Sequence, residues 1–201
     1  MTYEIEKLTG GPLAVNTYIL SAPGRDDCVV VDPGVPFAQL EEGLAGRRAA
    51  AVILTHAHFD HMLTLSPLRD AGAPLYLHRL DAPMLSDERL NLCAAIGKHL
   101  TAEPAERLLE DEDVVEAAGV TLRALHTPGH TPGGLCLLIG DDLLSGDTMF
   151  CGGYGRTDFP GGSARELRAS LARLCALEGH IRVHPGHGMD TTIAEEREAH
   201  A

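Results

Sequence analysis

The most informative feature of this 201-residue chain is a set of histidine and aspartate side chains that could together bind metal ions. Four of them lie within six positions, in the stretch Thr55-His-Ala-His-Phe-Asp-His61, and three more stand beside glycines later in the chain. The full set is His56, His58, Asp60, His61, His130, Asp147 and His187. A catalytic zinc ion usually takes three protein ligands and keeps one position open for water, so seven ligands are too many for one ion. The set therefore predicts two metal ions that share a hydroxide, with one carboxylate able to bridge them.

The ligand types also restrict the metal. Imidazole and carboxylate groups together suit zinc best, with iron and manganese as alternatives. Calcium and magnesium prefer sites built from oxygen ligands alone, so the histidines argue against both. The cluster contains no cysteine, which argues against a copper–thiolate centre. We therefore expect two divalent ions, with zinc first and iron or manganese as alternatives.

The elements before these residues indicate how they are positioned. Residues 51–55 form a short apolar, β-branched run that is typical of a buried strand. In extended backbone after that strand, His56 and His58 point to the same side. Asp60 and His61 then fall on the turn into the next helix, where they can reach a second ion. One loop can thus supply ligands to both ions.

The other three candidate ligands also follow predicted strands. Residues 120–126 alternate like a half-buried strand and lead into a proline- and glycine-rich loop that contains His130. Asp147 and His187 stand just after apolar runs that begin at positions 142 and 181. Four strand ends that converge on one edge are a common way for α/β proteins to build a site.

Periodicity and turn residues predict the remaining elements. The expected strand pair covers residues 15–20 and 28–32, with a turn at 22–24, and the expected helices cover residues 37–44, 62–71, 81–85, 90–109 and 164–177. Ser163 with Glu166 and Thr192 with Glu195 are capping-box pairs, the second of them before a short last helix. Leucines at helical spacing give the 164–177 helix a core face. The histidines outside the ligand set are expected to be surface or supporting residues: His78, His99, His126, His180, His184 and His200.

Composition is typical of one compact domain over residues 1–201, with 44% hydrophobic residues and no internal linker or repeat. No signal-peptide pattern and no apolar run of about 20 residues is present, so we expect a cytoplasmic protein without a membrane span. Five cysteines without paired spacing fit a reducing compartment. A net charge of −13 with only two lysines argues against nucleic acid as a partner, since phosphates require basic surface.

Five motifs occur in order along nearly the whole chain: Val31-Asp32-Pro-Gly34, Thr55-His-Ala-His-Phe-Asp-His61, Thr127-Pro-Gly-His130-Thr-Pro-Gly133, Ser145-Gly-Asp147-Thr148 and Pro185-Gly-His187-Gly188. This series resembles the metallo-β-lactamase fold superfamily, and within it the short, single-domain, glyoxalase II-like branch (hydroxyacylglutathione hydrolase-like). The resemblance implies an α/β fold, an αββα four-layer sandwich of two mixed β-sheets flanked by helices. It assigns His56, His58 and His130 to one metal, Asp60, His61 and His187 to the other, and Asp147 to both. Asp32 would support the ligand loop through hydrogen bonds, as carboxylates behind metal ligands commonly do.

Departures from related branches narrow the activity. The better-known zinc β-lactamases carry a cysteine where this chain has Asp147, so antibiotic hydrolysis is not expected. Flavodiiron oxidoreductases carry a glutamate at the position of His58. Full-length glyoxalase II enzymes add a helical C-terminal region with glutathione contacts, and because the sequence stops at Ala201, soon after its last candidate ligand, we do not expect those contacts here. In the short branch an arginine stands about where those enzymes place a substrate-binding lysine, which makes Arg156 the expected substrate contact, with Tyr154 a weaker candidate. The alternative for Arg156 is an ion pair with Asp158.

These observations predict a metal-dependent hydrolase that attacks a small-molecule thioester with a metal-bridging hydroxide. Asp60 is the candidate catalytic residue, since it can orient the water and manage its proton. The substrate could be a glutathione conjugate, although the sequence leaves the acyl group and the thiol carrier open. One alternative is a persulfide dioxygenase with a single iron bound by His56 or His58 together with His130 and Asp147. A second alternative is a metal-loaded binding module without catalysis. Metal stoichiometry and oxygen uptake separate the hydrolase from the dioxygenase.

Overall fold

The computed structural model of the protein describes residues 2–199, and its framework is two six-stranded β-sheets. The first sheet has the strand order β1-β2-β3-β4-β5-β6 and comprises β1 Glu4–Gly10, β2 Val15–Ser21, β3 Asp27–Val31, β4 Arg48–Ile53, β5 Leu75–His78 and β6 Arg107–Leu109. The second has the order β14-β13-β10-β9-β8-β7 and comprises β7 Val114–Ala117, β8 Val120–His126, β9 Leu135–Ile139, β10 Asp142–Gly146, β13 Arg182–Pro185 and β14 Thr191–Thr192. Both sheets combine parallel and antiparallel neighbours. A small hairpin of β11 Met149–Phe150 and β12 Gly153–Tyr154 lies beside the second sheet.

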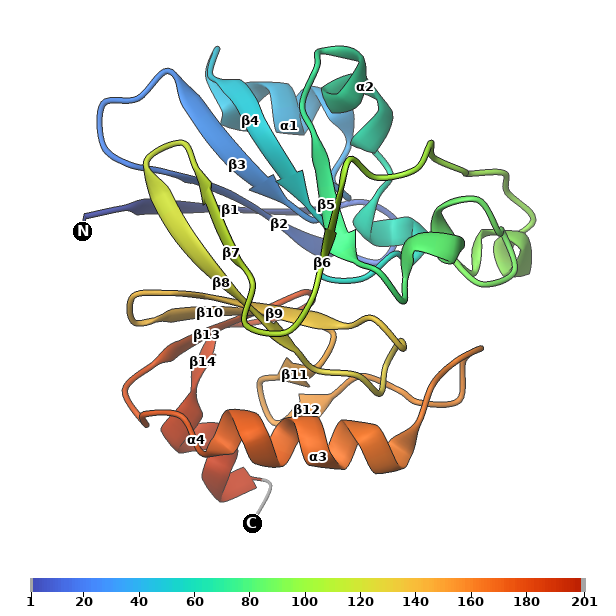
Figure 1. The fold of residues 1–201 in the computed structure, drawn as a ribbon, viewed down its shortest axis with the longest axis vertical. Helices are drawn as coiled ribbons and strands as arrows, with labels where there is room; N and C mark the ends of the chain where they lie inside the picture. Colours follow the sequence, from blue (N-terminus) through green and yellow to red (C-terminus); the bar gives the residue numbers. More distant parts are fainter. Residues whose placement is uncertain (1, 200–201) are drawn as a thin grey trace.

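Helices cover the outer face of each sheet (Figure 1). Helices α1 (Phe37–Leu44) and α2 (Leu65–Asp70) lie against the first sheet, and α3 (Ala164–Cys175) and α4 (Ile193–Ala199) lie against the second. The order of layers is therefore helix, sheet, sheet, helix. The predicted αββα sandwich is confirmed.

Strand β3 shows why the central strands of the first sheet have continuous runs of apolar residues in the sequence. Cys28 and Val30 pack in the core beneath α1 and α2, whereas Val29 and Val31 pack in the core between the two sheets. Side chains alternate between the faces of a strand, so a strand that is covered on both faces needs apolar residues at every position. A third core, which includes Leu167, lies between the second sheet and the helices α3 and α4.

The strongest local patterns gave the correct elements. The strand pair β2–β3 is antiparallel, and α1 spans the predicted residues 37–44. The Ser163 Oγ accepts a hydrogen bond from the Glu166 N–H at 3.3 Å, which begins α3 as the capping box predicts. At the start of α4, the Thr192 Oγ1 accepts from the Glu195 N–H at 3.3 Å, and the Thr192 N–H donates to the Glu195 carboxylate at 3.1 Å.

The predicted helix over residues 90–109 is wrong. That segment contains a single 3-10 turn, η3 (Cys93–Ile96), an irregular stretch, and strand β6. Leu92 and Gly97, on either side of the turn, both have positive φ angles (68° and 65°), which end a right-handed helix. Residues 107–109 pair in parallel with β5 instead. Pairing with a strand that is distant in sequence therefore outweighs the helical spacing of the leucines.

Three predicted elements near the ligand loops also differ from the expectation, while β2, β3 and α3 differ from it by one or two residues at their ends. Residues 82–85 form a 3-10 turn, η2 (Ala82–Leu85), where a helix over 81–85 was expected. The expected helix over 62–71 is shorter, since α2 begins at Leu65 after a separate 3-10 turn, η1 (Phe59–His61). The expected strand over 51–55 is β4, which begins at Arg48 and ends at Ile53. Each shift lies beside a candidate metal ligand or the loop that supports one.

A buried carboxylate on β10 links this strand to its neighbour β13 and to the N-terminal segment before β1. Asp142, which is only 1% exposed at its side chain, accepts hydrogen bonds from Arg182 at 2.7 and 2.6 Å and from the Tyr3 hydroxyl at 2.6 Å. Its Oδ1 lies 2.6 Å from Nε2 of His184. Burial alone would raise the pKa of Asp142, but these hydrogen bonds lower it. The carboxylate is therefore ionised in the folded protein.

Helices of the described residues 2–199 are all too short or too polar to cross a membrane. All five cysteines are free thiols, and Cys28 and Cys136 are buried small residues, as expected from their apolar surroundings. The cytoplasmic location and the single-domain organisation stay predictions.

Candidate metal centre

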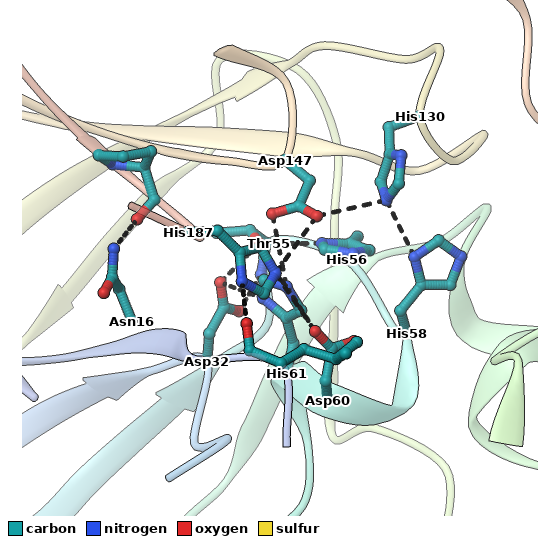
Figure 2. A network of polar contacts seen from close by, with 12 residues as sticks. Asn16, Asp32, Thr55, His56, His58, Asp60, His61, His130, Asp147 and His187 are labelled. Carbon is teal, nitrogen blue, oxygen red and sulfur yellow. Dashed lines mark hydrogen bonds and ion pairs between the residues drawn. The ribbon is translucent and has the colours of Figure 1, made fainter. Parts of the chain in front are cut away.

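The seven candidate ligands lie on loops that follow strands of both sheets. His56 and His58 follow β4, and Asp60 and His61 lie in η1. The other three follow the second sheet, with His130 after β8, Asp147 after β10 and His187 after β13. Figure 2 shows His130 and Asp147 approaching from one side and His58, Asp60 and His61 from the other. The structure thus brings all seven predicted ligands to one place between the sheets.

Ligand atoms gather in three overlapping groups, within each of which the atoms lie within 4.8 Å of one another. One group is His56, His58 and His130, a second is Asp60, His61 and His187, and a third joins His56, His61 and Asp147. The first two groups match the two metal positions that the family resemblance implies. We call them the first and the second triad.

In the first triad, Nε2 of His130 lies 3.0 Å from Nδ1 of His58. The ring of His56 lies edge-on to both, with centroid distances of 4.7 Å to His58 and 4.9 Å to His130. His130 is held from behind, because its Nδ1 lies 2.7 Å from the carbonyl oxygen of Arg156. That contact leaves Nε2 of His130 as the nitrogen that faces the triad.

In the second triad, Nε2 of His187 lies 3.2 Å from Oδ2 of Asp60 and 3.3 Å from Nε2 of His61. Asp147 stands between the triads. Its Oδ1 is 3.4 Å from Nε2 of His61, and its Oδ2 is 3.6 Å from Nε2 of both His130 and His187. This position is the one required of a bridging carboxylate.

Unpaired polar atoms test whether metal ions fit here. Among the described residues, the buried side-chain nitrogen and oxygen atoms without a hydrogen-bond partner all belong to candidate ligands: Nε2 of His56, Nε2 of His58, Nδ1 of His61 and Oδ1 of Asp147. Nδ1 of His61 lies 3.0 Å from the Asp32 carboxylate, so the test depends on the other three atoms. Buried polar atoms are almost always paired, since leaving one unsatisfied costs about 1–3 kcal/mol. The residues present therefore fit two ions with nitrogen and oxygen ligands.

The electrostatics of the triads support metal binding. Burial and the neighbouring histidines lower the pKa of His58 to about 3 and hold the pKa of His56 well below its usual value, so both rings are neutral. Although burial opposes it, the facing histidines lower the pKa of Asp147. Neutral imidazole and ionised carboxylate are the states that bind metals. In the second triad the carboxylates, foremost Asp60, overcome burial and raise the pKa of His61, which shows that this position attracts positive charge.

Asp32 lies behind the ligand loop, where the sequence placed it. Its Oδ1 accepts a hydrogen bond from the Thr55 N–H at 2.7 Å, and its Oδ2 accepts from the Thr55 hydroxyl at 2.6 Å. The same Oδ2 is 3.0 Å from Nδ1 of His61, and Asp32 is 1% exposed. This contact orients His61 so that Nε2 faces the second triad.

Asp81 is a supporting residue that the sequence analysis missed. It is fully buried, its Oδ1 accepts a hydrogen bond from the Gly133 N–H at 2.6 Å, and its Oδ2 accepts from the Thr131 hydroxyl at 2.8 Å. The Ala57 N–H also points to this carboxylate at 3.4 Å. Asp81 thus links the His130 loop to the loop of the first triad. An acidic residue shortly after a strand was the available signal, but it belongs to none of the five motifs.

The His187 loop is held by the first sheet. The Asn16 side-chain amide donates to the carbonyl oxygens of Pro185 at 2.9 Å and Gly188 at 3.0 Å, and Nδ1 of His187 lies 3.0 Å from the Leu13 carbonyl oxygen. Gly186 must be glycine, since a Cβ there would lie 2.3 Å from Oδ1 of Asp147. The sequence analysis did not identify Asn16, which lies far from the ligand motifs in sequence.

A cavity of about 590 Å³ opens in front of both triads. Both predicted substrate contacts, Arg156 and Tyr154, line it. The Arg156 guanidinium pairs with the Asp158 carboxylate through Nε at 2.7 Å and Nη2 at 2.6 Å, and it lies 4.2 Å from the Phe159 ring centroid. The ion pair that the sequence offered as an alternative therefore forms, while the arginine also borders the cavity.

Histidines outside the ligand set lie elsewhere. His78 and His126 stack on each other at 3.9 Å, His99 and His180 are exposed beside acidic residues, and His184 contacts Asp142. His200 lies outside the described residues. These positions fit the expected supporting and surface roles.

Comparison with known proteins places this architecture in a family. The family model of the metallo-beta-lactamase superfamily matches residues 10–187. A curated relative, the probable metallo-hydrolase YqgX of Bacillus subtilis, is 36% identical over 195 residues, which cover 94% of this chain and 92% of the relative.

Two solved structures share most of the fold. The BLEG-1 B3 metallo-beta-lactamase has a TM-score of 0.90 and 34% identity, with 97% of each chain covered. TTHA1623 in a di-iron-bound form has a TM-score of 0.85 and 37% identity, covering 96% of this chain and 98% of that one. Because one of these neighbours is described as a β-lactamase, the expectation against antibiotic hydrolysis stays a prediction. By its two sheets, its cluster of candidate ligands and these matches, the chain belongs to the metallo-beta-lactamase superfamily.

Proposed function

We propose that the protein is a binuclear metal-dependent hydrolase of small-molecule thioesters, of the hydroxyacylglutathione hydrolase type. The family supports a metal-dependent hydrolase, and the complete second triad supports two ions. The choice of a thioester depends on the wall of the cavity in front of the triads. A net charge of −13 supports a small molecule over nucleic acid as the substrate.

The composition of the cavity wall is the observation that carries the proposal. Among the described residues that line it, every imidazole and carboxyl group belongs to the candidate ligand set. The two other ionisable side chains of the wall are Tyr154 and Arg156. A leaving alkoxide or amine needs a proton donor as the bond breaks, whereas a thiol has a pKa of about 8.5 and departs readily as the thiolate. This wall has no imidazole or carboxyl donor apart from the ligands, and its one phenol, Tyr154, is 57% exposed, so the wall favours a leaving group that needs little protonation, such as the thiolate of a thioester.

The chain's own residues hold and orient the reactants. Two divalent ions, most simply zinc, would polarise the carbonyl and lower the pKa of a bound water from 15.7 to about 7. Asp60 lines the cavity, and although burial opposes it, the charge of His61 lowers the pKa of this carboxyl. Its ionised carboxylate is placed to accept a hydrogen bond from the attacking water and so to orient it.

Arg156 supplies the cation for an anionic thiol carrier. Its Nε and Nη2 each donate one hydrogen bond to Asp158, so the two N–H groups of Nη1 and the second N–H of Nη2 would remain to meet a carboxylate of the carrier. Stacking on Phe159 keeps the guanidinium beside the first triad, since the Phe159 ring lies 5.6 Å from the His58 ring. Tyr154, which is 57% exposed, would contact the carrier at the mouth of the cavity.

Elemental analysis combined with a substrate panel tests this proposal. We expect about two metal ions per chain and metal-dependent release of thiol from S-lactoylglutathione or another small thioester. Matched oxygen esters and β-lactams should be hydrolysed at least about tenfold more slowly, because their leaving groups need protonation. Iron is the alternative metal, given the di-iron-bound neighbour. A metal-loaded protein that hydrolyses β-lactams but no thioester would refute the proposal.

The same preparation tests the persulfide dioxygenase alternative. One iron per chain, with oxygen uptake in the presence of glutathione persulfide, would favour that activity over hydrolysis. The variants His58→Ala and Asp147→Ala should lose metal and thioesterase activity together. His99→Ala is the matched control, because that imidazole is 90% exposed and lies outside the triads. Retention of both metal and activity in either ligand variant would contradict the site.

A further inference from the structure

The cavity in front of the triads has an apolar wall that the proposed reaction does not itself require. Seven apolar side chains form it: Leu13, Phe59, Leu92, Ala95, Ile96, Phe150 and Phe159. Leu13 and Ile96 are 54% and 49% exposed although they are large hydrophobic residues. Apolar side chains that stay exposed around a concave site commonly mark a ligand surface.

This wall is built directly onto the turn that carries the second triad. The Phe59 N–H in η1 donates to the Asn91 carbonyl oxygen at 2.9 Å, just before the wall segment 92–96. The fully buried Asn91 side chain donates to the carbonyl oxygens of Met84 and Leu100 and accepts from the Cys93 N–H at 2.9 Å. Leu92 keeps a left-handed φ of 68° between these anchors. A strained backbone held by several bonds indicates a segment whose position matters for function.

The other apolar residues stand beside both triads. The Phe159 ring contacts the rings of His58 and His130 at centroid distances of 5.6 and 6.2 Å. The Phe150 ring lies 6.2 Å from the His187 ring, and the Leu13 carbonyl oxygen contacts Nδ1 of His187. A substrate carbonyl at the triads would therefore carry its acyl group between apolar side chains.

We propose that this wall binds the acyl group of the substrate, and that the preferred substrates are thioesters of apolar acyl groups, aliphatic or aromatic, over short hydroxyacyl groups. This inference rests on the proposed thioesterase function and adds the substrate class. Segment 92–96 and Leu13 offer carbon surface to the acyl group, so that lengthening it removes apolar area from water. A hydroxyl on the acyl group would lose its hydration against this surface without gaining a partner from it.

Binding of S-alkylglutathione thioethers, from methyl to octyl, tests the inference without turnover. Isothermal titration calorimetry on the metal-loaded protein should show affinity rising about three- to fourfold per added methylene until the wall is covered, which corresponds to about 0.8 kcal/mol each. The kcat/KM values of the matching acyl thioesters should rise in parallel. Ile96→Asn should flatten both series, and Ile96→Leu should preserve them. Leu108→Asn is the matched control, since Leu108 is 54% exposed on β6 and does not line the cavity.

The outcomes separate the inference from the proposed function. If kcat/KM for thioesters and the affinity for thioethers are both independent of chain length, the proposed acyl-binding role of the wall is refuted, while the proposed thioesterase function is supported. A rising thioether series without any thioester hydrolysis supports the apolar binding surface and overturns the thioesterase. A chain-length dependence that Ile96→Asn leaves unchanged also overturns the wall, because the preference would then arise elsewhere.

Discussion

Asp32→Asn should weaken the binding of the metal ion at the second triad and leave the binding of the ion at the first triad unchanged. Asparagine has nearly the shape of aspartate and tolerates the left-handed backbone at this position, where φ is 51°. Its amide oxygen can still accept from the Thr55 N–H. The tautomer of His61 should change, because a donating NH₂ group would replace the carboxylate oxygen that lies 3.0 Å from Nδ1 of this ring. Nδ1 would then accept a hydrogen bond, and the ring proton would move to Nε2, the nitrogen that faces the second triad.

The size of the effect follows from the lost contact. Replacement of residues behind metal ligands typically weakens metal binding by about 10- to 100-fold. We therefore expect about 10- to 100-fold weaker binding of one of the two ions. The first triad has no direct contact with Asp32 among the described hydrogen bonds and ion pairs, so the other ion should keep its affinity.

Stepwise metal titration in competition with a chelator measures both ions separately. The control is Asp141→Asn, which removes the same charge from a side chain that is 72% exposed. Thermal unfolding of each apoprotein checks that the fold is retained. Unchanged affinity for both ions, or selective loss of the ion at the first triad, would refute the assigned role of Asp32.

Three further predictions concern the site and the fold. Gly186→Ala should lower metal content below one ion per chain, because its Cβ would lie 2.3 Å from Oδ1 of Asp147; elemental analysis checks this, and Gly153→Ala, with open space around it, should bind metal normally. Asp142→Asn should destabilise the apoprotein by about 2 kcal/mol at pH 7. Because the folded-state pKa of Asp142 is lowered, this stabilisation is present above the unfolded pKa of about 3.9 and is lost as the pH falls through the folded pKa. Urea unfolding at pH 7 and pH 3 should therefore show a smaller difference from the wild type at pH 3, and an equal difference would contradict the ionised state. Leu122→Ala, which empties a fully buried position between the sheets, should cost about 2–5 kcal/mol in urea unfolding, and a loss below about 1 kcal/mol would argue against that core.

Local sequence patterns correctly predicted which segments are buried strands and where the chain turns. The strand pair, the helix over residues 37–44 and the Thr192–Glu195 capping box depend on contacts between residues that are close in sequence, and the structure has all of them. The Ser163–Glu166 box forms by half, because the Ser163 N–H donates to the Gly129 carbonyl oxygen. The apolar run of β3 indicates that both faces of the strand are buried, but the run does not predict that helices cover one face and the second sheet covers the other. The helix predicted over residues 90–109 failed for the opposite reason, because β6 forms by pairing with β5 about thirty positions earlier.

The ligand types, their order and their places after strands could be predicted from the amino-acid sequence, since each motif is a short strand–loop unit with its own local pattern. The meeting of loops from both sheets, their support by Asp81 and Asn16, and the place of segment 92–96 in the cavity wall were visible only in the folded protein. These features depend on hydrogen bonds and packing between residues that are distant in the chain. Such contacts stabilise a loop only when the folded sheets bring its partners close, so no local pattern records them.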